Sequence, residues 1–455
     1  MAWILGLFCC TLVFGYNLKY SRKVHNQDEY LLAGRHTSLL PLVATLVMTE
    51  FNTATLISFS SLGYVASYWA LSMAFIFLVG LVFYTLVVAK KWKQFNGVSV
   101  AHFFAVRYGR GLELLVASVL FLAMLGFSAA YVKSLTLLFL PLLNWNTFVL
   151  SAGLIGLVLV LTLRGGLNSI IHLDMISFVF VVLFFPTLVY FSYQLPFSHV
   201  APQLNLPQMQ QLLPSKFVLS LTIITMFSYI IAPWYGQKIV AAKSPRIAYF
   251  AAGIAAVIIF ILYGLGILAT AVLRSKGVVL NNAEVSLPYL IYHALPANLQ
   301  VLAYVVLFLV AASTLAGVWN AMVTLLVGSI FKTTKFRVAK SRAWMLLCAL
   351  LAYFIANTFI DNILSKMILF NIPIVAFSFA LLAGFYWRKA NACGAYVSIT
   401  VGSAWGVFCY LYFGETGLYT WYWAIYGVPL IFISGVITSL VTYKFKLTLS
   451  INEQI

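Results

Sequence analysis

The sequence predicts an all-α polytopic membrane protein with about thirteen transmembrane helices. Hydrophobic residues make up 63% of its 455 residues, charged residues make up only 8%, and the mean hydropathy is +1.02. Soluble globular domains do not have this composition. Apolar stretches of about 20 residues, each long enough to cross a bilayer as a helix, recur along the chain. The strands of a β-barrel are only about 10 residues long and alternate in polarity, so the pattern favours helices.

Each predicted helix corresponds to one apolar stretch. In chain order the stretches are residues 3–18, 38–60, 66–89, 113–139, 146–163, 174–194, 217–236, 247–273, 298–331, 343–360, 363–387, 393–412 and 421–443. The first stretch has no basic residue before it, and Lys19, Arg22 and Lys23 follow it. That arrangement favours a retained anchor, with the N-terminus outside, over a cleaved signal peptide.

The positive charge of the chain follows this topology. The formal net charge is +18, and 22 of the 27 Lys and Arg residues fall in loops that face the inside when the N-terminus is outside. Lys238, Lys243 and Arg246 form one such group, after the stretch 217–236. The asymmetry obeys the positive-inside rule, so the charge indicates topology rather than nucleic-acid binding. Residues 444–455 are expected to be a cytoplasmic tail.

The loops indicate neither an ATP-driven pump nor an enzyme. The longest interruptions between apolar stretches are about 20 residues, which is too short for a soluble domain. The sequence contains no GxxxxGK[ST] phosphate loop. It also contains no paired acids, zinc-type cluster or nucleophile–base arrangement.

Two groups of five predicted helices suggest an internal repeat. The first group covers residues 38–194 and begins inside, and the second covers 217–387 and begins outside. Because each group has an odd number of helices, the groups enter the membrane in opposite directions, as in the inverted repeats of many transporters. Their residues show no convincing similarity, so topology permits the repeat without proving it. The helix in residues 1–20 and the two in 393–443 lie outside both groups.

Glu50 is the acid placed deepest in an apolar span. A carboxylate facing lipid costs several kcal/mol, so we expect Glu50 to face other helices, a cavity or an ion. Hydroxyl and amide side chains surround it, including Asn52 and Thr53. Such side chains replace missing backbone partners where a membrane helix is broken, and the freed carbonyls bind Na⁺. The alternative is that these residues form polar contacts between packed helices.

Two further sites have the chemistry of an ion pathway. Ser313 and Thr314 lie together in the stretch 298–331, and with the carbonyl of Val310 they place neutral oxygens on one helical turn. Hydroxyl pairs are also common in membrane helices without any ion role. Asp174, at the inner end of its helix, is either a solvated acid or part of an ion exit route.

Lys133 is a basic residue inside a predicted helix. It lies about six residues, or about 9 Å, from the outer end of that helix. Its ammonium either extends to the outer surface, pairs with Glu50, or binds an anionic substrate. Lys366 lies nearer its helix end, with Asp361 in the same region, so extension to the surface is the better explanation there.

Four segments, in this order, resemble the sodium:solute symporter family, and are nearest in motif to the sodium/proline-type carriers. Tyr30–Arg35 (YLLAGR) looks like the family's lead-in to its first core helix. Arg164–Asp174 is similar to the spacing GG-x-x-A-x-x-x-T-D, and Gln237–Ser244 (QKIVAAKS) to Q-R-x-x-A-A-K-S. Ser313-Thr314 resembles the S-[ST] pair of the eighth core helix. Together the segments cover roughly residues 28–345.

The resemblance implies a five-plus-five inverted-repeat (LeuT-like) core with one extra N-terminal and two extra C-terminal helices. It also implies Na⁺-driven alternating access. The implied sodium ligands are the carbonyls of Met48, Phe51 and Val310 and the hydroxyls of Ser313 and Thr314. Glu50 falls where the proline carrier has an aspartate important for sodium, and Asp174 matches an aspartate linked to ion release.

This chain departs from the family pattern at several positions. Glu50 is one methylene longer than aspartate, Ser60-Ser61 replace a Pro-Gly, Ser169 replaces an alanine and Leu173 replaces a threonine. These departures leave the substrate, and the choice of Na⁺ over H⁺, open.

The sequence therefore predicts a Na⁺-coupled importer of a small organic solute in the cytoplasmic (inner) membrane of a bacterium or a plasma membrane. Solute is expected near Glu50, Asn52 and Thr53, with Lys133 as a candidate partner if the solute carries a carboxylate. Lipid and solute are the expected partners, without nucleic acid or an obligate protein partner. The alternatives are an H⁺-coupled symporter of the same fold and a non-transporting membrane sensor.

Overall fold

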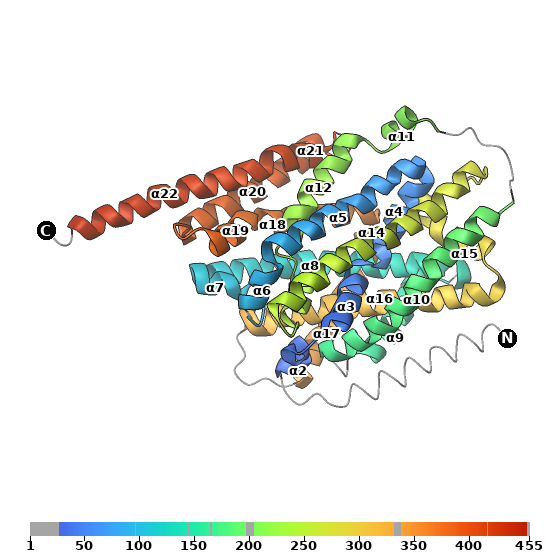
Figure 1. The fold of residues 1–455 in the computed structure, drawn as a ribbon, viewed down its shortest axis with the longest axis horizontal. Helices are drawn as coiled ribbons and strands as arrows, with labels where there is room; N and C mark the ends of the chain where they lie inside the picture. The colour runs from blue at the N-terminus through green and yellow to red at the C-terminus, as the bar shows by residue number, and fades with distance from the viewer. Residues whose placement is uncertain are drawn as a thin grey trace.

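The computed structural model describes residues 27–95, 97–143, 145–163, 166–196, 204–331, 338–415 and 417–452. The helix predicted in residues 1–20 lies outside this part of the chain. Within it, regular structure is helical apart from one isolated bridge, between Thr37 and Ala242. The helices run side by side in one bundle (Figure 1).

The helices of the first half connect largely through short turns. They are α2 (Gln27–Leu32), α3 (Leu39–Glu50), α4 (Thr53–Ala66), α5 (Leu71–Tyr84), α6 (Lys90–Phe95), α7 (His102–Tyr108), α8 (Arg110–Leu143), α9 (Thr147–Thr162) and α10 (Gly166–Gln194). A 3-10 turn at Ser67–Ala70 joins α4 to α5, and Ser67 has a φ of +54° there.

The second half continues the bundle to the C-terminal helices. Its helices are α11 (Leu206–Leu212), α12 (Ser215–Tyr229), α13 (Pro233–Val240), α14 (Pro245–Ser275), α15 (Ser286–Ala294), α16 (Ala297–Leu325), α17 (Val338–Thr358), α18 (Ile363–Ala376), α19 (Ser378–Tyr386), α20 (Ala392–Phe413), α21 (Tyr419–Tyr422) and α22 (Val428–Asn452). The predicted tail 444–455 thus begins as a continuation of α22.

The all-α polytopic membrane class is confirmed. In the described ranges, nine helices are long and apolar enough to cross a membrane, or ten if the bent pair α11 and α12 forms one span. Two shorter apolar helices, α3 and one within α9, add to these. The count of thirteen stays a prediction.

Two helices near the centre of the bundle are interrupted. The first break, at Phe51 and Asn52, separates α3 from α4. The second, at residues 230–232, separates α12 from α13, and Pro233 begins α13. Proline suits this position because the first turn of a helix leaves its N–H groups without partners. Each break lies in the first span of one predicted five-helix group, and the repeat itself stays a prediction.

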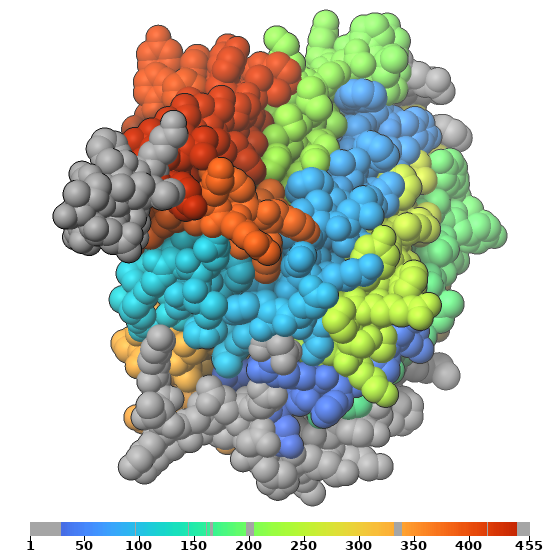
Figure 2. All heavy atoms as spheres, turned by 60° about the vertical axis from the view of Figure 1, so that its left-hand side comes forward, coloured from blue at the N-terminus to red at the C-terminus, as the bar shows by residue number. Residues whose placement is uncertain are grey.

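The core lies around the breaks, and the C-terminal helices lie at the edge. The membrane spans of α8 and α16 are the most buried of the described spans, whereas only 33% of the spans that contain α17 and α22 is buried. Figure 2 shows the C-terminal helices in red at one edge, beside α12 in green. Two helices were predicted after the core, in residues 393–443, and α20 and α22 occupy this region.

Helices α4 and α14 approach closely at Gly63. A methyl group on Gly63 would lie 2.6 Å from the carbonyl oxygen of Ile267 and 2.7 Å from the hydroxyl oxygen of Thr270. That hydroxyl donates a hydrogen bond to the carbonyl of Ser60 (2.8 Å). The contact therefore depends on the absence of a side chain at residue 63.

We expect Gly63→Ala to lower the free energy of unfolding by about 1–3 kcal/mol, because the added methyl forces the two helices apart. Denaturant unfolding of the purified protein in detergent measures this. Gly153→Ala in α9 is the matched control, since a methyl there meets no atom within 4 Å. Equal stability of the two variants would contradict the packing argument.

Candidate functional site

The break between α3 and α4 is held by side chains that satisfy its backbone. The Asn52 amide nitrogen donates to the carbonyl of Glu50 (2.9 Å), and the Asn52 side-chain oxygen caps α4 by accepting from the Thr55 N–H (2.8 Å). The hydroxyl of Tyr263, from α14, also donates to the Glu50 carbonyl. The polar run predicted to support a broken helix does so here, and Tyr263 is a partner that sequence reasoning missed.

The Glu50 carboxylate joins the two breaks. Its side chain is only 1% exposed. One carboxylate oxygen accepts from the hydroxyl of Tyr229, at the end of α12, and the other accepts from the indole N–H of Trp234, at the start of α13 (3.0 Å). Glu50 therefore faces other helices rather than lipid. Its two partners flank the second break.

The predicted sodium ligands on α3 and α16 lie together. The Thr314 hydroxyl donates to the carbonyls of Met48 (3.2 Å) and Val310 (2.9 Å). The Ser313 hydroxyl donates to the Val310 carbonyl (3.1 Å). Phe51, the remaining predicted ligand, follows Met48 by three residues and is buried. The oxygens of two segments 266 residues apart in sequence thus meet at one point.

Asp174 lies on the inner side of this cluster and is fully buried. Its Oδ2 accepts from the Thr45 hydroxyl and from the ammonium of Lys238 (2.8 Å). Lys238 also donates to the Thr45 carbonyl (3.2 Å). In the described residues, Asp174 Oδ1 has no hydrogen-bond partner. Thr45 precedes Met48 by three residues, or about one helical turn, and the Asp174 carboxylate also interacts with the side chain of Ser313, one of the predicted ligands.

The predicted position of Lys238 in an inner loop is wrong. The sequence places it in an inner loop, with Lys243 and Arg246. In the structure it is 1% exposed, within α13, and its ammonium is paired with Asp174. The alternative that Asp174 is a solvated acid is also wrong. Hydropathy alone does not reveal such a pair, since its partners are 64 residues apart.

Thr53 and Lys133 are the remaining residues that were predicted to bind solute. The Thr53 hydroxyl shares a hydrogen bond with Ser134 of α8 (2.8 Å) and so links α4 to α8. Burial raises the pKa of the Glu284 carboxyl, and the positive charge of nearby Lys133 opposes that rise. Glu50 accepts its hydrogen bonds from Tyr229 and Trp234 rather than from Lys133.

A pocket opens beside the break, which we call the outer pocket. Its volume is about 680 Å³, including space open to solvent. Its lining residues are Asn52, Thr55, Phe59, Met73, Ile76, Phe77, Phe127, Tyr131, Leu221, Ile224, Thr225, Ser228, Tyr229, Trp234, Leu364, Met367, Ile368 and Asn371. In the predicted topology helices α12 and α18 begin outside, which would place the pocket between mid-membrane and that side. Asn52 is the one predicted substrate residue in the lining.

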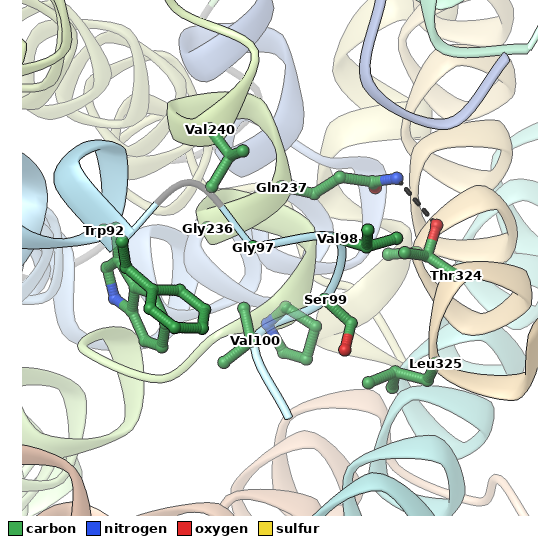
Figure 3. A pocket seen from close by; sticks show the side chains of 13 residues that line it. Trp92, Gly97, Val98, Ser99, Val100, Gly236, Gln237, Val240, Thr324 and Leu325 are labelled. Atoms are coloured by element: carbon green, nitrogen blue, oxygen red, sulfur yellow. Dashed lines mark hydrogen bonds between the residues drawn. The ribbon is translucent and has the colours of Figure 1, made fainter. Parts of the chain in front are cut away.

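A second space, the inner pocket, lies beside α13 and has a volume of about 330 Å³, including space open to solvent (Figure 3). The Gln237 amide donates to the Thr324 hydroxyl of α16 (2.9 Å), drawn as a dashed line, and to the Leu31 carbonyl of α2 (2.7 Å). The Thr37 N–H also donates to the Ala241 carbonyl (3.0 Å). These bonds tie α13 to three neighbouring segments on the inner side.

Comparison with known proteins establishes the fold. No family model and no curated protein matches the sequence. The structure is similar to a solved structure described as the "substrate-bound outward-open state of a Na⁺-coupled sialic acid symporter", which "reveals a novel Na⁺-site". The TM-score is 0.78, and the match covers 97% of each chain at 15% sequence identity. The chain has the fold of a membrane transporter.

We expect Lys238→Met to lower the free energy of unfolding by about 3–5 kcal/mol, because it leaves Asp174 buried without its charged partner. Adding Asp174→Asn removes the unpaired charge, so the double variant is expected to recover most of that loss. Denaturant unfolding of all three variants and the parent gives the coupling energy. Simple additivity of the two single effects would show that the pair is not coupled.

Proposed function

We propose that this protein imports a small organic solute by Na⁺-coupled symport, in the cytoplasmic membrane of a bacterium or in a plasma membrane. The observation that carries the proposal is the hydrogen bond from the Thr314 hydroxyl to the Met48 carbonyl (3.2 Å). It brings the broken helix and α16 together at neutral oxygens, which suit a hard cation such as Na⁺. The proposed membership of the sodium:solute symporter family rests on the motifs described above.

In this proposal Na⁺ binds the carbonyls of Met48, Phe51 and Val310 and the hydroxyls of Ser313 and Thr314. Both hydroxyls now donate to carbonyls, and rotation would turn their oxygen lone pairs towards a cation. A bound ion would join α3 to α16 and stabilise the outward-facing arrangement. Solute would then enter the outer pocket beside the break.

Release to the inside requires α13 to lose its inner contacts. The Gln237 bonds to Thr324 and Leu31 would break first in this proposal, and the inner pocket would widen. Asp174 lies beside the predicted ligand Ser313, and its Oδ1 has no hydrogen-bond partner among the described residues, so it would offer the next position for the departing ion. Each positive charge moved inward gains about 2.3 kcal/mol per 100 mV, which supports roughly fifty-fold accumulation of a neutral solute.

We expect Ser313→Ala with Thr314→Ala to raise the Na⁺ concentration for half-maximal thermal stabilisation by about tenfold or more, since about 1 kcal/mol is lost with each hydroxyl ligand. The melting temperature of the purified protein is measured as Na⁺ replaces K⁺ at constant ionic strength. Ser398→Ala in α20 is the control, because that buried hydroxyl bonds the Ala395 carbonyl of its own helix (2.9 Å).

Two outcomes would contradict the proposal. Equal stabilisation by Na⁺ and K⁺, together with a strong dependence on pH, would favour the H⁺-coupled alternative. Solute binding without uptake into proteoliposomes under any ion gradient would favour the membrane sensor.

A further inference from the structure

Six aromatic side chains line the outer pocket in two groups. Phe77 packs edge to face against Phe59 on one side and Tyr229 on the other, with ring centroids 5.5 and 5.7 Å apart. Phe127 packs in the same way against Trp234, at 5.2 Å. Tyr131 completes the set. A space walled by several aromatic rings has the form of the aromatic cages that bind ammonium groups.

A carboxyl group lies behind this wall. Among the described residues that line the outer pocket, none is acidic or basic. Directly behind Tyr229 and Trp234 lies Glu50, and each of the two rings donates one hydrogen bond to it. The Trp234 indole N–H can only donate, so Glu50 Oε1 is an acceptor, and the Tyr229 hydroxyl lies within hydrogen-bond reach of Oε2. A cation bound in front of these rings would favour the ionised form of Glu50. Donation to a carboxylate also enriches the electron density of the donating ring, which strengthens its attraction for a cation.

The nearby basic residues are engaged elsewhere. The Lys238 ammonium is bonded to Asp174 and to the Thr45 carbonyl on the inner side. Lys133 is outside the lining of the outer pocket, and its charge acts on Glu284. A solute anion would therefore enter a pocket that has a buried carboxylate behind it and no basic side chain in its wall.

From this arrangement we propose that the outer pocket binds a small organic cation, a solute with a quaternary or protonated amine. The proposal rests on the function proposed above and names the substrate class of the same pocket. The ammonium lies among the rings of Phe77, Phe127 and Trp234, in front of Glu50. The neutral polar side chains of the lining, such as Ser228 and Asn371, are left to bind a hydroxyl or carbonyl group of the solute.

The test uses three probes that share a branched head of similar size and differ in charge. They are choline (cation), 3,3-dimethyl-1-butanol (neutral) and 3,3-dimethylbutyrate (anion). Their dissociation constants are measured on the purified full-length protein by thermal shift at fixed Na⁺ concentration. We expect choline to bind about tenfold or more tightly than the neutral probe, as cation–π attraction in a desolvated site allows. The anion is expected to bind most weakly.

Variants assign the effect to the charge and to the rings. Glu50→Gln is expected to reduce the preference for choline to less than about threefold, because the residue keeps its size and loses its charge. Phe127→Leu removes a ring without contacting Glu50, and it is expected to weaken choline binding while changing the neutral probe little. Glu113→Gln is the matched control: Glu113 is buried near the start of α8, 2.5 Å from Arg110, and is not among the residues that line the pocket. It should keep the parent preference.

The proposal is overturned if the neutral probe or the anion binds as tightly as choline, or if choline does not bind at millimolar concentration. It is also overturned if Glu50→Gln and Phe127→Leu both keep the parent's preference for choline over the neutral probe. These outcomes are separate from failure of the transport proposal. Choline preference without Na⁺-dependent uptake would refute the coupling and leave the pocket assignment standing. If Na⁺ drives the uptake of only neutral or anionic solutes, the pocket assignment is refuted and the coupling still stands.

Discussion

An interrupted helix in the middle of a membrane leaves backbone groups without partners, and the surrounding structure must supply them. Lipid offers no hydrogen-bond partners, so each group left unpaired in the membrane core costs several kcal/mol. Here Asn52 and Tyr263 bond the freed carbonyl of Glu50, and Asn52 also caps the next helix. The break is therefore a fixed element of the fold, held by side chains from its own segment and from α14.

The same two turns of chain serve the proposed ion and the proposed solute. The Met48 carbonyl meets Thr314 on one side of the break, and the Glu50 carboxylate meets Tyr229 and Trp234 on the other. A ligand that orders one side of so short a segment also orders the other. Coupling between two ligands is reciprocal, so a solute that binds in front of Glu50 should in turn favour the ion site.

Helix α13 is held in the bundle by polar contacts as well as by apolar packing. Gln237 bonds α2 and α16, and the neighbouring Lys238 bonds α3 and α10. Two consecutive residues thus tie one short helix to four others. In the proposed transport cycle, water could replace these polar contacts when α13 moves. The free-energy cost of moving α13 would therefore be lower than the cost of exposing an apolar helix face to water. Asp174 and Lys238 gain most from remaining paired, since separating them within the membrane leaves two buried charges.

The sequence by itself determined the membrane class, since hydropathy and length depend on composition along the chain and not on which helices meet. It also predicted the internal position of Glu50, because an acid facing lipid is too costly to be tolerated, and it offered a broken helix as one of two explanations of the polar run beside it. Only the tertiary structure decided which side chains meet these groups. Tyr229, Trp234 and Tyr263 are ordinary aromatic residues in membrane helices, and their roles depend on the rotation of helices about 180 to 210 residues away. Lys238 was assigned to a loop for the same reason: a one-dimensional charge pattern does not distinguish an ammonium in water from one held by a carboxylate on a packed neighbour.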